Sequence, residues 1–354
     1  MSRTSFIHCS DLHLGCQQFN EAQRWEDFRD SFAGIVDYAV ENKVDYLLIG
    51  GDVFHHRSVN APTLSMAMGL MDRLRSADIK VIAIEGNHDK ALYLEEDSWM
   101  SFLNRHGYLK LLRPEFHEGR VQVAAYDGNR GCLIEKDGLR IIGLGYLGAT
   151  TRQRLEEIAP QIEKSDAFTI VLLHAAVDKL LGQDMAGVGR ECLGAFAGKV
   201  DYFALGHIHS RQEHLDFIFN PGAPESVHID EMRKNQEKGF YHVTVDGKDM
   251  DVRFAASTRR AIRYFDVDLT GTEVPAMAAD RVLAVMDASD ITNYSLPIVQ
   301  VNLYGMVDFN SFSIDTGSIE ETVRKRYSCL AAEVINNTNL AQVSSRVIDG
   351  QDFN

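Results

Sequence analysis

The sequence predicts a layered α/β fold, because short apolar runs alternate with segments of helical spacing. Five runs are rich in β-branched or aromatic residues and show little polar alternation, which indicates strands covered on both faces. These runs are 6–9, 46–49, 81–84, 170–173 and 202–205. Helical apolar spacing follows the first two runs, over 28–40 and 64–74. Alternating strands and helices are typical of a layered α/β domain.

A short polar cluster follows each of these apolar runs. The clusters are Asp11-Leu12-His13, Gly50-Gly51-Asp52, Gly86-Asn87-His88-Asp89, His174 and Gly206-His207-Ile208-His209. In layered α/β sheets, ligands bind in the crevice beyond the carboxyl ends of the strands. Because every cluster begins about one or two residues from such an end, we expect the five segments to converge on one crevice.

The residue types in these clusters suit metal binding. Asp11 and His13 lie one residue apart, so both side chains point to one side of an extended segment and can chelate one ion. His207 and His209 repeat this spacing after another run. Asp52 follows two glycines that allow close approach of the backbone, and its two oxygens can bridge two cations.

Asn87 and His174 complete a second, more neutral set of ligands. Oxygen and imidazole without thiolate suit manganese, iron, zinc or a mixed pair better than a structural zinc site. Two cations about 3.5–4 Å apart would clamp a phosphate, lower the pKa of a bridging water and stabilise the attacking and leaving oxygens. The pattern therefore indicates metal-assisted hydrolysis of a phosphate ester.

A single Asp-x-His or His-x-His at a strand end is more often a turn or a helix cap than a pair of ligands. The joint occurrence of five clusters, each after an apolar run, is what favours a site. The other histidines have no such context, and we interpret them as surface or satisfied core residues. They are His8, His56, His106, His117, His214, His228 and His242.

The blocks that carry these residues resemble the calcineurin-like metallophosphoesterase superfamily. Within it they are most similar to the SbcD-type exonuclease subunits, relatives of the nuclease of the eukaryotic double-strand-break repair complex. Further pointers are the Asp52-Val53-Phe54-His55 form of the second block, the segment 220–226 and Lys238-Gly239-Phe240. Ala223 stands where a serine is common. The resemblance covers roughly residues 4–270.

The resemblance implies an α/β/β/α sandwich of two sheets and a ligand set for two divalent ions, with Mn²⁺ as the expected metal. One ion would be held by Asp11, His13, Asp52 and His209, and the other by Asp52, Asn87, His174 and His207, with Asp52 as the bridge.

The resemblance also implies two catalytic histidines. His88 matches a histidine that supports the transition state or protonates the leaving oxygen, a role that suits imidazole because its pKa lies near neutrality. His55 matches a second histidine that faces the phosphate, although the adjacent His56 leaves open which ring faces inward. Asp89 either orients His88 or caps a turn.

The composition fits an intracellular enzyme. A chain of 354 residues that is 45% hydrophobic can bury one large core and a smaller one. Its five cysteines form no Cys-x-x-Cys pair, which favours a reducing compartment. The sequence enters the first strand at once, without room for a signal peptide, and no apolar stretch approaches the roughly 20 residues of a membrane span. We expect a cytoplasmic protein that does not bind membranes.

The charge balance argues against a free-standing DNA-binding protein. There are 36 Lys and Arg residues against 51 Asp and Glu residues, a net charge of −15, and an acidic surface repels phosphates. Bound metals would add local positive charge, and a partner protein could supply DNA affinity. The local basic clusters are more often solvated faces than binding sites; they are Arg73/Arg75, Arg152/Arg154 and Arg259/Arg260/Arg263.

The pattern predicts a domain boundary between 257 and 258. Alternating segments at 240–245 and 250–255 predict antiparallel strands that close a second sheet against the first. Beyond them the sequence predicts strand 262–269, helix 274–288, strand 298–304 and helix 319–336. The resemblance implies that 1–257 is a phosphoesterase domain and that 258–354 is a small α/β capping domain that holds DNA.

The leading hypothesis is a manganese-dependent DNA nuclease that acts at ends, hairpins or single strands, in repair or defence. The alternatives are a small-molecule or cyclic-nucleotide phosphodiesterase and a binding module whose inactive site recognises phosphate. The resemblance further implies an SbcC-type coiled-coil ATPase as partner. It also implies a homodimer formed through a helical face near 60–76 or 91–105.

Overall fold

The computed structural model describes residues 3–92, 95, 97–177, 187–228, 231 and 237–340. The chain divides into two compact units, Met1–Arg259 and Arg260–Asn354. The tail 341–354 of the predicted capping domain lies outside the described residues. No described helix combines the length and the apolarity that crossing a lipid bilayer requires.

The first unit contains a six-stranded sheet with the order β16-β15-β1-β2-β3-β4. Its strands are β1 (Thr4–Cys9), β2 (Tyr46–Ile49), β3 (Lys80–Ala83), β4 (Lys110–Leu111), β15 (Gly239–Asp246) and β16 (Asp249–Ala256). The first four run parallel to one another, and β15 pairs antiparallel with β1 and with β16. The predicted runs 6–9, 46–49 and 81–84 are thus neighbouring strands of this sheet.

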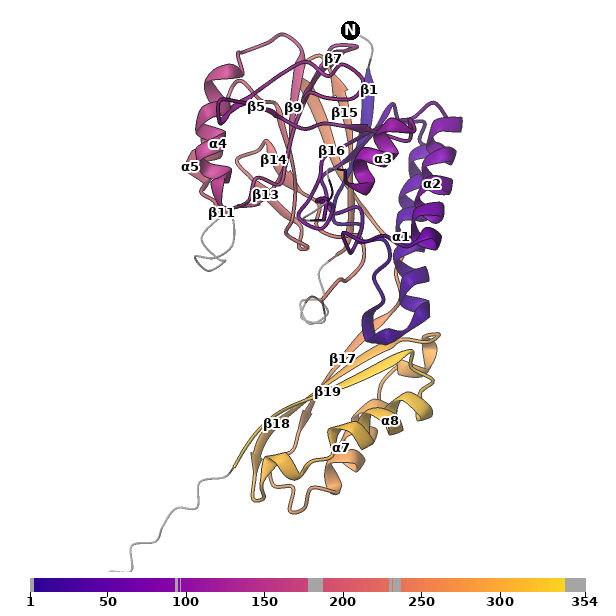
Figure 1. Ribbon diagram of the computed structural model, residues 1–354. Coiled ribbons are helices and arrows are strands. Elements are labelled where there is room, and N and C mark those ends of the chain that lie inside the picture. The colour runs from indigo at the N-terminus through magenta and orange to yellow at the C-terminus, as the bar shows by residue number, and fades with distance from the viewer. Residues whose placement is uncertain are drawn as a thin grey trace, which may run out of the picture. The chain divides into compact units, whose positions relative to one another are not determined.

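Three helices cover one face of this sheet: α1 (Ala22–Glu41), α2 (Ala61–Ser76) and α3 (Trp99–Arg105). Figure 1 shows α1 and α2 lying side by side. Asn60 starts α2 because its side chain accepts the Thr63 N–H, and Ser98 starts α3 by accepting the Ser101 N–H. Phe32 and Ile35 of α1 pack with Leu47 of β2, which confirms the helical spacing predicted for 28–40.

A second sheet has the order β13-β14-β12-β9-β8-β7. Its strands are β7 (Leu133–Lys136), β8 (Leu139–Gly145), β9 (Phe168–His174), β12 (Tyr202–Gly206), β13 (Gln212–His214) and β14 (Ile218–Asn220). The four central strands are parallel and the two edge strands antiparallel. Helices α4 (Thr151–Ile158) and α5 (Arg190–Gly194) contribute Leu155, Ile158 and Leu193 to the core on the outer face of this sheet.

The two sheets pack face to face. Phe6 and Leu48 of the first sheet lie in one buried cluster with Ile170, Leu172 and Tyr202 of the second. The layers are therefore helices, sheet, sheet and helices, and the predicted α/β/β/α sandwich is confirmed. Small pairs flank the layers: β5 (Glu115–His117) with β6 (Arg120–Gln122), and β10 (Ala176–Val177) with β11 (Gly187–Val188).

The hairpin β15–β16 does not close a second sheet, and that prediction was wrong. It extends the first sheet, because the backbone of β15 pairs with β1 from Thr4↔Val245 to His8↔Tyr241. Local alternation identifies a hairpin but carries no information about which strand edge accepts its hydrogen bonds.

The second unit is a three-stranded parallel sheet with two helices. Its elements are β17 (Ile262–Asp268), α7 (Met277–Asp287), β18 (Ile298–Val307), α8 (Thr316–Arg326) and β19 (Ala331–Leu340). Val282 of α7 and Val323 of α8 are buried against Val301 of β18 in a core of this unit.

The predicted helix 319–336 was wrong beyond Arg326. The helix ends there, Ser328 adopts a left-handed φ of 50°, and the chain then forms β19. Every residue of β19 pairs with β18 in parallel register. The apolar spacing of Ile319 and Val323 continues by coincidence into the strand, and inter-strand pairing decides its conformation.

Candidate metal centre

All five predicted clusters meet where strands of both sheets end. The segments follow β1, β2, β3, β9 and β12. Four of their residues have left-handed φ values: Asp11 (54°), His13 (44°), Asp52 (51°) and His207 (93°). For residues other than glycine this conformation costs about 1–3 kcal/mol each and concentrates at functional sites. Ten other described residues that are not glycine share this conformation, but here four of them gather at one crevice.

The first group of donors consists of Asp11, His13 and His209, whose ligand atoms lie within 4.8 Å of one another. His13 Nε2 is 3.1 Å from His209 Nε2, and His209 Nε2 is 3.9 Å from Asp11 Oδ1. Burial, reinforced by the adjacent His209, holds the pKa of His13 well below its ordinary value. His13 is therefore a neutral imidazole, the form that binds metals.

The second group consists of Asp52, His174 and His207, and Asn87 joins it. The Asn87 Oδ1 oxygen lies 3.2 Å from His174 Nε2 and 3.1 Å from His207 Nδ1. One amide oxygen, one carboxylate and two imidazoles thus face a common point. All seven predicted ligands belong to these two groups.

Asp52 lies between the two groups. Its Oδ2 is 3.2 Å from His174 Nε2 and 3.9 Å from His13 Nε2, whereas Oδ1 accepts the His88 N–H at 2.8 Å. The preceding Gly51 has a φ of 97°, and a Cβ there would lie 2.5 Å from His174 Nδ1. Glycine is therefore needed for the approach that brings Asp52 between the groups.

Hydrogen bonds set the tautomers of two imidazoles. His174 Nδ1 donates to the Gly50 carbonyl at 2.7 Å, which leaves Nε2 as the ring nitrogen that faces Asp52. His209 Nδ1 donates to Glu231 Oε1 at 2.6 Å, which leaves Nε2 toward His13. Such partners fix the ring orientation of metal ligands and raise their basicity.

Sequence reasoning missed Glu231. Besides His209, its carboxylate binds the buried Lys238 ammonium at 2.6 Å, and Lys238 donates to the His209 carbonyl at 2.7 Å. Burial works against ionisation, but His209 and Lys238 together lower the pKa of Glu231 to about 2. No spacing in the sequence marks Glu231, because its partner His209 lies in a distant segment.

Two further histidines adjoin the donors. His88 Nδ1 donates to the His55 carbonyl at 2.6 Å, and its ring centroid lies 4.9 Å from that of His13. His55 Nδ1 is 3.3 Å from His13 Nδ1, and the His55 and His88 rings stack at 5.7 Å. His56 is exposed, so His55 is the inward-facing ring of the pair.

The hydrogen bonds of the Asp89 carboxylate stabilise the loop and do not orient the His88 ring. Its carboxylate accepts N–H groups from Gly86 (3.0 Å), Val53 (3.2 Å) and Phe54 (3.1 Å). Burial, with a contribution from Asp52, raises the pKa of Asp89 to about 7. The carboxylate therefore ties the loop after β3 to the loop after β2.

The donor set fits divalent cations. Asp11 and Asp52 are buried carboxylates, and buried charge is unfavourable without a counter-charge. Burial alone would lower the pKa of His174, but Asp52 and Asp11 raise it to about 9. The cluster thus draws positive charge toward Asp52, and nitrogen and oxygen donors without thiolate suit divalent first-row metals.

Two other expectations concern residues outside the donor groups. His8 is buried and hydrogen-bonded to the Tyr202 hydroxyl and the Leu205 carbonyl, as expected of a satisfied core histidine. His228 is exposed, yet its ring stacks on His209 at 5.3 Å, so it borders the centre. Several arginines of the basic clusters pair with nearby carboxylates, as solvated faces do: Arg73–Asp37, Arg75–Asp72, Arg152–Glu156, Arg154–Glu157 and Arg263–Asp290.

Comparison with known proteins yields a family match and a set of relatives. A family model described as calcineurin-like phosphoesterase matches residues 4–211. A protein named DNA double-strand break repair protein Mre11 from Haloferax volcanii is 33% identical over 286 residues, which are 79% of this chain and 58% of that protein. The protein of the same name from Saccharolobus solfataricus is 26% identical over 251 residues, 70% of this chain and 61% of that one.

The chain spans less than two thirds of the length of several curated relatives, with 61%, 45% and 64% of their residues covered in three of them. Among solved structures, a dimetal phosphatase from Danio rerio aligns with a TM-score of 0.47 at 12% identity, over 72% of this chain and 97% of that chain.

Proposed function

Because the chain belongs to the calcineurin-like phosphoesterase family, we propose that it is a metal-dependent DNA nuclease that hydrolyses phosphodiester bonds. The observation that carries the proposal is the position of Asp52 between two donor groups, with the His88 and His55 rings beside them. Similarity to proteins named for DNA double-strand break repair supports DNA as the substrate.

We assign the ligands as the sequence predicts. Asp11, His13, Asp52 and His209 would hold one ion, and Asp52, Asn87, His174 and His207 the other. A pair of divalent ions supplies Lewis acidity toward the phosphate and a hydroxide nucleophile at neutral pH. We propose manganese, since a mixture of carboxylate, amide oxygen and imidazole suits it.

His88 is proposed to give a proton to the leaving oxygen. Its Nδ1 donates to the His55 carbonyl, so Nε2 is the nitrogen that remains for the substrate. The Asp52 carboxylate, which accepts the His88 backbone N–H, holds this residue beside the donor groups. His55, on the inward side of the 55–56 pair, is proposed to hydrogen-bond a phosphate oxygen.

The remaining parts of the proposal concern partners and location. We propose that 258–354 caps the DNA, that an SbcC-type coiled-coil ATPase is the partner, and that the protein is cytoplasmic; five unpaired cysteines support a reducing compartment. A homodimer is proposed through 60–76 or 91–105. Half-buried Leu64, Met68 and Trp99 support these faces, whereas Tyr93, Leu94 and Glu96 lie outside the described residues.

The test is cleavage of end-labelled linear and hairpin DNA with manganese, magnesium or chelator, beside cleavage of bis-p-nitrophenyl phosphate. His88→Gln should lower DNA turnover by about 10²–10⁴-fold, as expected when a general acid is lost, and should retain bound metal. Asp52→Asn should lose both activity and metal. Asp37→Asn, which removes an exposed carboxylate paired with Arg73, is the matched control.

The outcomes separate the alternatives. DNA cleavage that needs manganese and fails in both variants supports the nuclease. Cleavage of the small diester alone would indicate a small-molecule or cyclic-nucleotide phosphodiesterase. Absence of both activities and of bound metal would indicate a binding module.

A further inference from the structure

A groove borders the candidate metal centre beside the loop that follows β3. Its inner part is a cavity of about 290 Å³ lined by Lys90, Arg113, Phe116 and Tyr146, among others. The Tyr146 ring lies 5.7 Å from the ring of the proposed ligand His207, and Lys90 directly follows Asp89 in the ligand-bearing loop. The cavity therefore lies beside the candidate metal centre.

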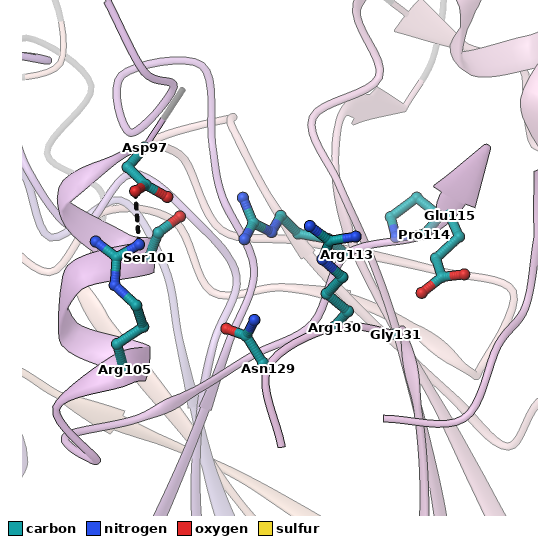
Figure 2. Close-up of a pocket in the computed structure, with 9 residues that line it drawn as sticks. All are labelled: Asp97, Ser101, Arg105, Arg113, Pro114, Glu115, Asn129, Arg130 and Gly131. Carbon is teal, nitrogen blue, oxygen red and sulfur yellow. Dashed lines mark hydrogen bonds and ion pairs between the residues drawn. The ribbon is translucent and has the colours of Figure 1, made fainter. Parts of the chain in front are cut away.

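The outer part is a second cavity of about 530 Å³ that shares Arg113 and Pro114 with the first. Figure 2 shows the Arg113 and Arg130 guanidinium groups between the helix that carries Arg105 and the segment that carries Glu115. We call the two cavities together the basic groove, because five basic and three acidic side chains line it. This local excess of positively charged side chains contrasts with the chain's net charge of −15.

The cations of the basic groove are only partly neutralised. Lys90 Nζ and Arg113 Nη1 share one buried carboxylate, Glu85, at 3.6 and 3.9 Å. Glu85 also accepts the Ser98 hydroxyl at 2.5 Å. Arg105 is paired with Asp97 at 2.5 Å, whereas no ion pair within 4 Å links the Arg130 guanidinium to any residue that the structure describes. Positive charge therefore remains at Arg113 and Arg130 for an anion.

An aromatic side chain faces solvent next to these cations. Phe116 of β5 is 56% exposed, and the Arg154 guanidinium lies over its ring at 5.2 Å. Leaving a large apolar ring in water is unfavourable, and an exposed aromatic among arginines is the arrangement by which proteins bind unpaired nucleobases and the adjoining phosphates. A duplex hides its bases, so this combination favours a single strand.

We propose that the basic groove is a subsite for single-stranded DNA that continues from the phosphate at the metal centre. Lys90, Arg113 and Arg130 contact successive backbone phosphates, and one base stacks on Phe116. Two adjoining cavities provide more room than one phosphodiester needs, so the subsite favours oligonucleotides over small diesters. This inference rests on the proposed nuclease function and specifies which form of DNA the site accepts.

The test compares the wild type with Arg113→Gln/Arg130→Gln and with Phe116→Ala. A fluorescent thymidine oligonucleotide is bound in chelator at several salt concentrations, and the manganese-loaded enzyme is assayed on the same oligonucleotide and on bis-p-nitrophenyl phosphate. Lys136→Gln/Lys164→Gln removes the same charge at two exposed lysines of the first unit that line neither cavity, and is the matched control.

The double arginine variant should reduce the slope of log K against log salt by about 0.7 per lost phosphate contact. Phe116→Ala should weaken oligonucleotide binding by about fivefold or more. In both variants the KM for the oligonucleotide should rise more than the KM for the small diester. The lysine control should keep the wild-type salt slope, apart from a small effect of net charge.

An unchanged salt slope in the arginine variant would overturn the inference. Equal losses of activity on the two substrates would also overturn it, because the arginines would then act on the metal centre through Glu85. Tighter binding of RNA or of duplex DNA would overturn the assignment to single-stranded DNA. A wild type that binds the oligonucleotide with an arginine-dependent salt slope but never cleaves it would refute the nuclease function while supporting the groove.

Discussion

At the scale of single residues, the candidate metal centre depends on hydrogen bonds that the proposed ligands make with the ring nitrogen that faces away from the donor groups. Gly50 fixes the tautomer of His174, and Glu231 fixes that of His209. The same logic applies to His8 in the core, whose Nε2 must donate to the Leu205 carbonyl, so that Nδ1 accepts from the Tyr202 hydroxyl. Each ring is therefore held in one orientation.

Replacing Glu231 tests this at His209. Glu231→Ala should weaken metal binding by about 10–100-fold, because His209 loses the partner that orients it. Glu231→Gln should restore part of the affinity, since its amide oxygen can still accept the Nδ1–H. Calorimetric titration with manganese measures both. Glu213→Gln, which removes a carboxylate that binds Arg211 and Tyr241 instead, is the control; equal losses there would refute the role of Glu231.

Acidification tests the core histidine. Burial, opposed by the bond to Leu205, lowers the pKa of His8 from 6.5 to about 3. Between these two pH values the imidazole of His8 is protonated in the unfolded chain but not in the folded chain. The free energy of unfolding therefore falls as the pH drops below about 6.5. In chelator, the free energy of unfolding of the wild type should fall by up to about 1.4 kcal/mol more per pH unit than that of His8→Gln. Parallel denaturant-derived curves from pH 8 to 5 would contradict this.

At the scale of elements, the site arises because strands from two sheets end at the same crevice and each end turns sharply. The parallel order of β1, β2 and β3 places three clusters together, and β9 and β12 add two more from the facing sheet. The turns are tight enough that Gly86 lies against the Asp52 side chain. Glycine is therefore required at these turns so that the proposed ligands can approach one another.

Two glycine substitutions test this requirement. A Cβ at Gly86 would lie 2.0 Å from Asp52 Oδ1, so Gly86→Ala should displace the carboxylate that is proposed to bridge the ions, and should reduce both manganese content and diester hydrolysis. A Cβ at Gly69, inside α2, meets nothing within 4 Å. Gly69→Ala should keep activity and stabilise the protein by up to about 1 kcal/mol. Full metal content in Gly86→Ala would show that the turn is more adaptable than proposed.

At the scale of the whole molecule, the two compact units have separate hydrophobic cores. One core of the first unit includes Val171 of β9 beneath α4 and α5, whereas Val301 of β18 lies in the core of the second unit. Separate cores allow separate unfolding transitions. Phosphoester chemistry is expected to depend on the first unit, which holds every proposed ligand.

Truncating each core tests this independence. Both valines are fully buried, so replacement by alanine should cost about 2 kcal/mol. In scanning calorimetry, Val301→Ala should lower only the transition of the second unit, and Val171→Ala only that of the first. Hydrolysis of bis-p-nitrophenyl phosphate should persist above the second unit's transition. A single transition lowered by both changes would show that the units unfold together.

Most of the first unit could be predicted from spacing, because its buried strands are short, continuous apolar runs and its ligands follow them directly. The segment 46–49 agrees with β2 to the residue. The errors lie where long-range pairing decides conformation: β19 instead of helix, and the hairpin β15–β16 on the first sheet instead of a second. Local periodicity predicts neither the pairing of β19 with β18 nor the pairing of β15 with β1.

By itself, the sequence determined the α/β class, the strands that end in polar clusters and the identity of seven candidate ligands, because these depend on periodicity and on residue chemistry. Only the tertiary structure decided that Glu231 supports His209, that Asp89 ties two loops together and that His55 rather than His56 faces inward. The basic groove also appears only there, since its arginines come from distant segments. These hydrogen bonds and cavities form between segments that are far apart in the sequence, and the residue spacing within a segment does not reveal such contacts.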